Sequence, residues 1–108
     1  MPDGRILIAD DEDSLRWVLE KGFRGAGYQV TAVKDGTAAL REVEGGPFDL
    51  ILLDIRMPGI DGLSLLKQVR AGRPDAQVVI MTAHGTMETA VAAMKDGAYD
   101  YLTKPVDV

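Results

Sequence analysis

Cysteine is absent from this chain of 108 residues, and the only histidine is His84. These absences exclude a disulfide framework, a thiolate zinc site and a histidine-rich metal cluster. No apolar run reaches the roughly 20 residues of a membrane span, and the first four residues begin no signal peptide. We therefore expect a cytoplasmic protein without a membrane segment.

An excess of positive charge is also lacking. Lys and Arg total 12, Asp and Glu total 17, and the formal net charge is −5. Nucleic-acid binding depends on Lys and Arg that neutralise phosphates, so we expect no direct nucleic-acid binding by this domain. The length fits one domain, and a composition that is 46% hydrophobic and 27% charged is ordinary for a globular fold with one core.

Strand-like and helical patterns alternate along the whole chain. Short apolar runs are typical of strands that are covered on both faces of a sheet. The alternation predicts an α/β fold with a doubly wound, five-stranded parallel sheet. The expected strands are Arg5–Ala9, Tyr28–Val33, Leu50–Leu53, Gln77–Met81 and Tyr99–Leu102, and the expected helices are Asp13–Arg24, Thr37–Val43, Leu63–Arg70 and Met87–Lys95.

Local signals support the helices. In the first, the spacing of Leu15, Val18, Leu19 and Phe23 predicts a stripe that faces the core. The expected N-caps are Asp35, Asp61 and Thr86, and helix ends are expected near Gly25, Gly27, Gly72 and Gly97. The chain stops soon after the fifth strand, where a fifth helix would be expected to cover the sheet. We therefore expect residues 1–108 to be one domain excerpted from a longer protein.

Acidic residues follow two of the expected strands. Asp10 and Asp11 come after the first strand, and Asp54 ends the third. Right-handed crossovers commonly place such strands side by side, and functional groups gather at the carboxyl ends of parallel strands. Neighbouring carboxylates repel one another unless a proton or a cation intervenes. Oxygen ligands without His or Cys select a hard cation, so the sequence predicts a Mg²⁺ site.

A carboxylate beside Mg²⁺ is suited to phosphoryl transfer, because the metal neutralises charge on the phosphoryl oxygens. Asp54 would act as the nucleophile and form an acyl phosphate. Thr82, at the end of the fourth strand, offers a hydroxyl group, and Lys104, after the fifth strand, offers a positive charge. Taken singly, each residue has a structural explanation as a helix cap, a turn residue or a solvated charge. Their joint placement at strand ends favours the functional explanation.

Two other classes with related chemistry fit less well. A phosphatase of the haloacid dehalogenase type needs a second carboxylate two residues after the nucleophile, and that position is Arg56 here. A flavodoxin-like nucleotide binder would place its phosphate loop after the first strand, where residues 10–12 (DDE) would repel phosphate. No glycine-rich phosphate-binding motif follows a strand.

Four segments carry a family resemblance: residues 8–12 (IADDE), 49–62 (DLILLDIRMPGIDG), 81–83 (MTA) and 104–105 (KP). Over its whole length the chain resembles the receiver domains of bacterial two-component response regulators. The resemblance implies a flavodoxin/CheY-like fold, here without its final helix, and a regulatory domain whose chemistry is limited to Mg²⁺-dependent self-phosphorylation and autodephosphorylation. It implies these site residues: Asp54 as phosphoacceptor, Asp11 and Asp54 as direct Mg²⁺ ligands, Asp10 as a ligand through water, the carbonyl of Arg56 as a further ligand, and Thr82 and Lys104 as phosphoryl contacts.

Residues 15–20, 81–88 and 97–105 resemble more narrowly the NtrC group of regulators that act with sigma-54 polymerase. This implies a histidine kinase or phosphotransfer protein as phosphoryl donor, and a homodimer or higher oligomer on activation. It also implies an ATPase domain and a DNA-binding domain elsewhere in the full-length protein. The alternative is a stand-alone receiver that acts in a phosphorelay or binds a target protein.

The expected switch links Asp54 to the sheet edge. Our hypothesis is that phosphorylation draws Thr82 toward the phosphoryl group together with the loop that carries His84. Tyr101 then turns inward, and the helix at 87–95 repacks. The alternative for Tyr101 is an edge residue with its hydroxyl group in water. Trp17 is predicted to face outward, either as a contact for the kinase or covered by a neighbouring segment.

Overall fold

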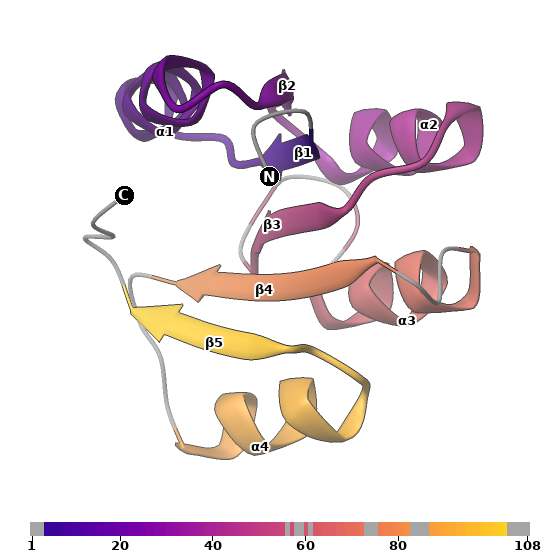
Figure 1. Cartoon of the computed structure of the whole chain (residues 1–108). Coiled ribbons are helices and arrows are strands. Elements are labelled where there is room, and N and C mark those ends of the chain that lie inside the picture. Colours follow the sequence, from indigo (N-terminus) through magenta and orange to yellow (C-terminus); the bar gives the residue numbers. More distant parts are fainter. Residues whose placement is uncertain are drawn as a thin grey trace.

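A computed structural model describes residues 4–55, 57, 60, 62–72, 76–82 and 87–103, without the side chains of residues 87, 89 and 103. The predictions made for Arg56, Asp61, His84, Thr86 and Lys104 lie outside these residues. Strands and helices alternate throughout the described chain, as the sequence predicts (Figure 1). The elements are β1 (Arg5–Ala9), α1 (Asp13–Gly25), β2 (Gln29–Val33), α2 (Gly36–Gly45), β3 (Leu50–Asp54), α3 (Gly62–Gly72), β4 (Gln77–Thr82), α4 (Met87–Lys95) and β5 (Asp100–Thr103).

The five strands form one parallel sheet in the order β2-β1-β3-β4-β5. This confirms the doubly wound fold. The winding direction reverses between β1 and β3, which lie side by side with Ala9 paired to Leu53. Their carboxyl ends therefore meet at the centre of one edge, the usual position of a site in an open α/β sheet.

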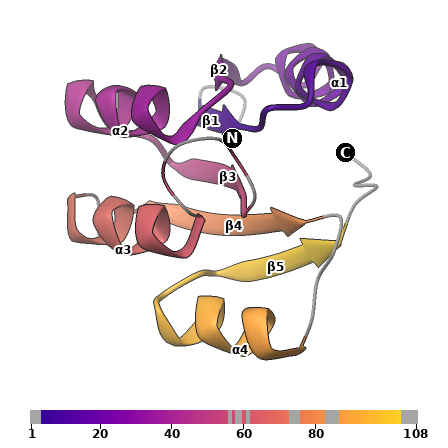
Figure 2. The ribbon, with the colours of Figure 1, turned by 180° about the vertical axis from the view of Figure 1, so that it is seen from behind.

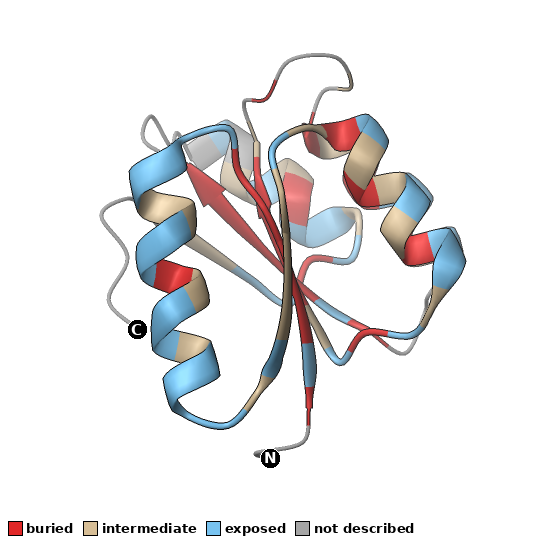
Figure 3. Ribbon diagram, turned by 90° about the horizontal axis from the view of Figure 1, so that it is seen from above, coloured by how far each residue is buried: buried red, intermediate tan, exposed pale blue. Residues whose placement is uncertain are grey.

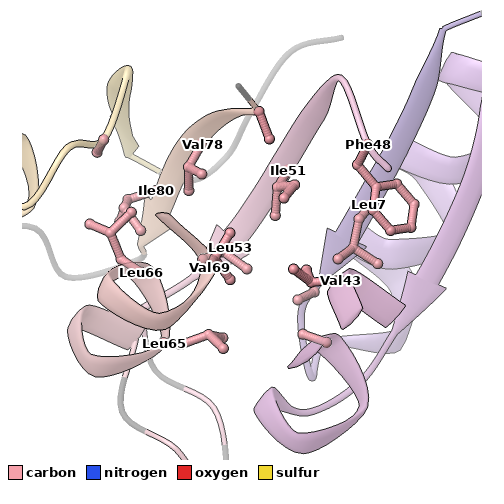
Figure 4. Close-up of a cluster of buried hydrophobic side chains, with 14 of the residues drawn as sticks. Leu7, Val43, Phe48, Ile51, Leu53, Leu65, Leu66, Val69, Val78 and Ile80 are labelled. Carbon is pink, nitrogen blue, oxygen red and sulfur yellow. The ribbon is translucent and has the colours of Figure 1, made fainter. Parts of the chain in front are cut away.

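Each face of the sheet carries its own apolar cluster, because successive strand residues point to opposite faces. Leu7, Ile51 and Leu53 belong to the main core, which packs against α2 and α3 (Figure 4). This core also includes Ala93 of α4. Ile8 and Leu52 belong to a second core on the face covered by α1. Figure 2 shows α1 apart from the other three helices, and Figure 3 shows buried strands between helices with exposed outer surfaces. Burying a side chain such as Leu53 contributes about 1.5–3 kcal/mol.

The predicted core stripe of α1 is correct in part. Leu19 is fully buried, and Leu15 and Phe23 pack against the second core. The prediction for Val18 is wrong, since that side chain is 49% exposed. At 3.6 residues per turn, Val18 lies about 100° around the helix from Leu19, on the outer flank of the stripe. Trp17 faces outward as predicted, with 61% exposure.

The ends of the helices follow the local signals. Asp35 caps α2, because its Oδ1 accepts a hydrogen bond of 2.8 Å from the amide of Ala38. Just after the C-terminal end of α4, Gly97 has a φ of 99°, a conformation that glycine adopts without steric cost. The amide of Ala98 donates to the carbonyl of Ala93 at 3.0 Å, which closes the helix in a Schellman motif.

Gly62 allows a close approach of the chain just beyond β3. Its amide donates to the carbonyl oxygen of Ile55 at 3.1 Å. A Cβ atom at position 62 would lie 2.7 Å from that same oxygen, inside the contact distance of real Cβ atoms. The start of α3 is thereby held against the residue that follows Asp54.

Replacing Gly62 with alanine tests whether the close contact with Ile55 requires glycine. We expect Gly62→Ala to lower the free energy of unfolding by about 1–3 kcal/mol, because the backbone must shift to admit the methyl group. Gly25→Ala is the matched control, since nothing lies within 4 Å of a Cβ atom there. Urea unfolding measures both. Equal effects of the two substitutions would contradict the steric explanation.

Candidate functional site

Two buried carboxylates stand at the adjoining ends of the central strands. Asp10 directly follows β1, and Asp54 is the last residue of β3. Because Ala9 and Leu53 face the main core, alternation turns Asp10 and Asp54 toward the opposite face. They are 0% and 4% exposed, although carboxylates are rarely buried without a partner or a metal.

Asp11 completes an acidic cluster with these two residues. One carboxylate oxygen from each of Asp10, Asp11 and Asp54 lies within 4.8 Å of the others. The structure therefore brings together the three carboxylates that the sequence places at two strand ends. Asp11 is exposed, so the cluster opens to solvent on its side.

The chemistry of this cluster fits a hard divalent cation. Its three side chains offer only carboxylate oxygens, the ligands that Mg²⁺ and Ca²⁺ prefer. Asp10, Asp11 and Asp54 are the residues that would hold such an ion, since their carboxylate oxygens lie within 4.8 Å of one another. Two like charges at the upper limit of this separation, 4.8 Å, repel by about 3.5 kcal/mol at an effective dielectric constant of about 20. A bound cation would remove this repulsion.

The loop that carries Asp10 and Asp11 is closed by hydrogen bonds. The amide of Asp10 donates to the carbonyl of Val33 at 3.1 Å. Its Oδ1 accepts from the amide of Glu12 at 2.8 Å, just before α1 begins. This bond closes a turn before α1 and does not cap the helix, whose N-cap is Glu12 without a side-chain cap hydrogen bond, so the helix-capping explanation for Asp10 is wrong.

Thr82 ends β4 at the same edge of the sheet and is 1% exposed. It follows Met81, the register partner of Asp54 on the neighbouring strand. The amide of Ile55 donates to the carbonyl of Met81 at 3.0 Å, which ties the two strand ends together. Thr82 therefore lies on the strand next to the acidic cluster.

Tyr101 is half-buried on β5. Its exposure lies between that of a ring turned fully inward and that of an edge residue in water. It pairs in register with Ile80 and packs against the main core. Thr82 is two residues beyond Ile80, and alternation places it on the same face of the sheet. Thr82 and Tyr101 are therefore diagonal neighbours on the face that α4 covers.

Arg16 is a residue near the cluster to which sequence reasoning assigned no role. From the first turns of α1, its guanidinium group donates to the carbonyl oxygen of Asp10 at 2.8 Å and to the carboxylate of Asp13. The sequence offers one signal for this contact, an arginine six positions after Asp10. The pattern of apolar residues does not say in which direction such a long side chain turns.

A sheet in this order with acidic residues at the ends of β1 and β3 is the arrangement expected of a receiver domain. The chain belongs to the response regulator receiver domain family, whose model it matches over residues 6–108. Among curated proteins it is 45% identical to the DNA-binding transcriptional regulator NtrC of Escherichia coli K12 over all 108 residues. It is 46% identical to the transcriptional regulatory protein ZraR of the same organism over 102 residues. The chain spans 23% of the length of each.

Solved structures agree with this assignment. A response regulator of Burkholderia pseudomallei, with a phosphorylated aspartic acid and a calcium ion, is 33% identical with a TM-score of 0.94. The match covers 98% of this chain and 62% of that one. The beryllofluoride-activated receiver domain dimer of NtrC4 is 35% identical with a TM-score of 0.91 and covers 100% of this chain and 88% of its own. These matches confirm the CheY-like fold and the resemblance to NtrC-type receivers, and place the chain among regulatory domains.

No helix in the described part of the chain has both the length and the apolar character that crossing a bilayer requires.

Divalent cations should stabilise the domain. At free Mg²⁺ about 100 times its dissociation constant, we expect the free energy of unfolding to rise by ~2.7 kcal/mol. Asp11→Asn should lose most of this gain, because one of the three charged ligands is gone. Glu44→Gln, which neutralises an exposed carboxylate at the end of α2, should keep it. Thermal unfolding with and without Mg²⁺ measures the gain, and an equal gain in both variants would contradict the site.

Proposed function

We propose that this domain is a phosphorylation-dependent switch in which Asp54 accepts a phosphoryl group in a Mg²⁺-dependent reaction. The observation that carries the proposal is the meeting of three carboxylates, within 4.8 Å, at the carboxyl ends of β1 and β3. The phosphorylated aspartic acid and the calcium ion in the structure of the Burkholderia relative support the proposal by analogy.

The site residues have distinct roles in this proposal. Asp11 and Asp54 would hold Mg²⁺ directly, Asp10 would hold it through water, and the backbone carbonyl of Arg56 would be a further ligand. When bound, the metal neutralises charge that develops on the phosphoryl oxygens. Lys104, which like Arg56 lies outside the described residues, supplies a second positive charge.

The transfer step uses the Asp54 carboxylate as nucleophile. One of its oxygens attacks the phosphorus of a phosphohistidine donor while the phosphorus–nitrogen bond breaks. The departing imidazole keeps the electron pair of that bond and takes up a proton from solvent. The product is an acyl phosphate on Asp54, and its hydrolysis by water restores the carboxylate and releases inorganic phosphate.

The response begins at Thr82, whose hydroxyl group donates to an oxygen of the new phosphoryl group. The movement of Thr82 lets Tyr101, its diagonal neighbour on the same face, turn inward. The helix α4 is poorly anchored, since Ala93 is its one buried residue in the described part of the chain. By contrast, α3 buries Leu65, Leu66 and Val69. A few kcal/mol are therefore enough to shift the position of α4.

The proposed setting is a longer cytoplasmic regulator, with residues 1–108 as its receiver. NtrC and ZraR are transcriptional regulators, and this chain matches 23% of their length. We propose an ATPase domain and a DNA-binding domain as output, with sigma-54-dependent transcription as the regulated process. A histidine kinase or phosphotransfer protein is the phosphoryl donor, and activation leads to a homodimer or higher oligomer, as the NtrC4 receiver dimer suggests.

The phosphoacceptor can be tested by intact mass. Incubation with acetyl phosphate and Mg²⁺ should add the mass of one phosphoryl group to the wild-type protein, because Asp54 supplies the attacking oxygen. Asp54→Ala should show no addition, while Glu44→Gln should be modified like the wild type. An adduct that forms without Mg²⁺, or that survives Asp54→Ala, would contradict the assignment.

The coupling route can be tested separately from phosphorylation. With beryllofluoride as a phosphoryl mimic, we expect Thr82→Ala to bind the mimic but to lose the amide shifts of α4 seen by NMR. Thr82→Ser retains the hydroxyl group and should retain most of those shifts. If Thr82→Ala produced the full set of α4 shifts, the coupling would not run through Thr82.

A further inference from the structure

The side chain of Arg16 reaches back from α1 over the loop that carries the acidic cluster. Long side chains on a helix lean toward its N-terminus, and this one spans the first turn. One guanidinium nitrogen donates to the carbonyl oxygen of Asp10 at 2.8 Å, and the other donates to Asp13. The Arg16 side chain is only 20% exposed, so it is held in place rather than free in solvent.

The contact of Arg16 with Asp10 adds to two other hydrogen bonds that hold this loop. The amide of Asp10 is bound to Val33 on β2, and the carboxylate of Asp10 accepts from the amide of Glu12. Arg16 binds the remaining main-chain group of Asp10, its carbonyl oxygen. The exposed side chain of Asp11 lies between these anchors, so the backbone of the loop sets its direction toward the cluster.

We infer that Arg16 is a positioning residue, which holds the loop at residues 10–12 so that Asp10 and Asp11 face the divalent cation together with Asp54. This inference rests on the proposed function, because it concerns the same metal site. Arg16 acts through the backbone of Asp10 and is not itself a ligand. Its contribution is to keep like charges close together before the cation arrives.

The direction in which Mg²⁺ affinity changes when Arg16 is replaced distinguishes a positioning role from a purely electrostatic one. A positive guanidinium group near a cation site repels the cation, so charge alone predicts tighter Mg²⁺ binding when Arg16 is removed. The positioning role predicts weaker binding, because the carboxylates are then no longer held in place. The two explanations cannot both describe the same variant.

The helix α1 offers a matched control in Arg24. Like Arg16, it pairs with a carboxylate on its own helix and donates to a main-chain carbonyl, here Glu20 at 3.0 Å and Val30 at 3.1 Å. Its partners lie at the opposite end of α1, away from the acidic cluster. Arg24→Met therefore removes the same kinds of contact without touching the loop.

The experiment compares Mg²⁺ titrations of the wild type, Arg16→Met, Arg16→Lys and Arg24→Met, followed by amide chemical shifts. We expect Arg16→Met to weaken Mg²⁺ binding about tenfold, a typical loss for a residue that orients metal ligands. Arg16→Lys keeps the charge but lacks the planar fork, so its affinity should be intermediate. Arg24→Met should bind Mg²⁺ like the wild type.

A second measurement needs no metal. Hydrogen exchange of the Glu12 amide reports whether the loop is closed, since that amide donates to Asp10. It should accelerate in Arg16→Met and stay unchanged in Arg24→Met. Unchanged or tighter Mg²⁺ binding in both Arg16 variants would overturn the positioning role of Arg16 but not the proposed function. A wild-type protein that does not bind Mg²⁺ would overturn the proposed function, and the inference with it.

Discussion

The repulsion between carboxylates at one edge of the sheet is the constraint on which the rest of this structure depends. Asp10 and Asp54 are buried at the ends of adjacent strands, and Asp11 stands beside them. A fold that only had to be stable would not concentrate negative charge there. The parallel register of β1 with β3, and the two apolar cores on either side, supply the rigidity that keeps these groups together.

The same architecture separates a more buried part of the domain from a less buried part. The strands β1 and β3 lie in the middle of the sheet, with both faces covered, and they carry the acidic cluster. At the edge, Ala93 is the one buried residue among the described side chains of α4, and Tyr101 and Leu102 of β5 are half-buried. In the function that we propose, a charge added at Asp54 would meet a buried site on one side and the less buried α4 on the other, which is the arrangement that a switch requires.

Much of this could be predicted from sequence because its causes are local or follow from topology. Apolar runs and glycine positions were enough to predict five strands and four helices, and the alternation predicted a parallel sheet, while the strand order came from the structure. The meeting of Asp10, Asp11 and Asp54 follows from the ends of two neighbouring strands. Val18 was misplaced because a helical pattern fixes the spacing of a stripe but not its centre. Arg16 and Gly62 were missed because their contacts depend on how a side chain and a loop turn back on the main chain.

The central claim is that Asp10, Asp11 and Asp54 share one divalent cation beside a nucleophilic oxygen. Crystals soaked in Mn²⁺, whose anomalous scattering locates the ion, test it most directly. The account predicts one strong anomalous peak within coordination distance of carboxylate oxygens of Asp11 and Asp54. A protein that gives no peak there, or binds the ion only elsewhere, would contradict it.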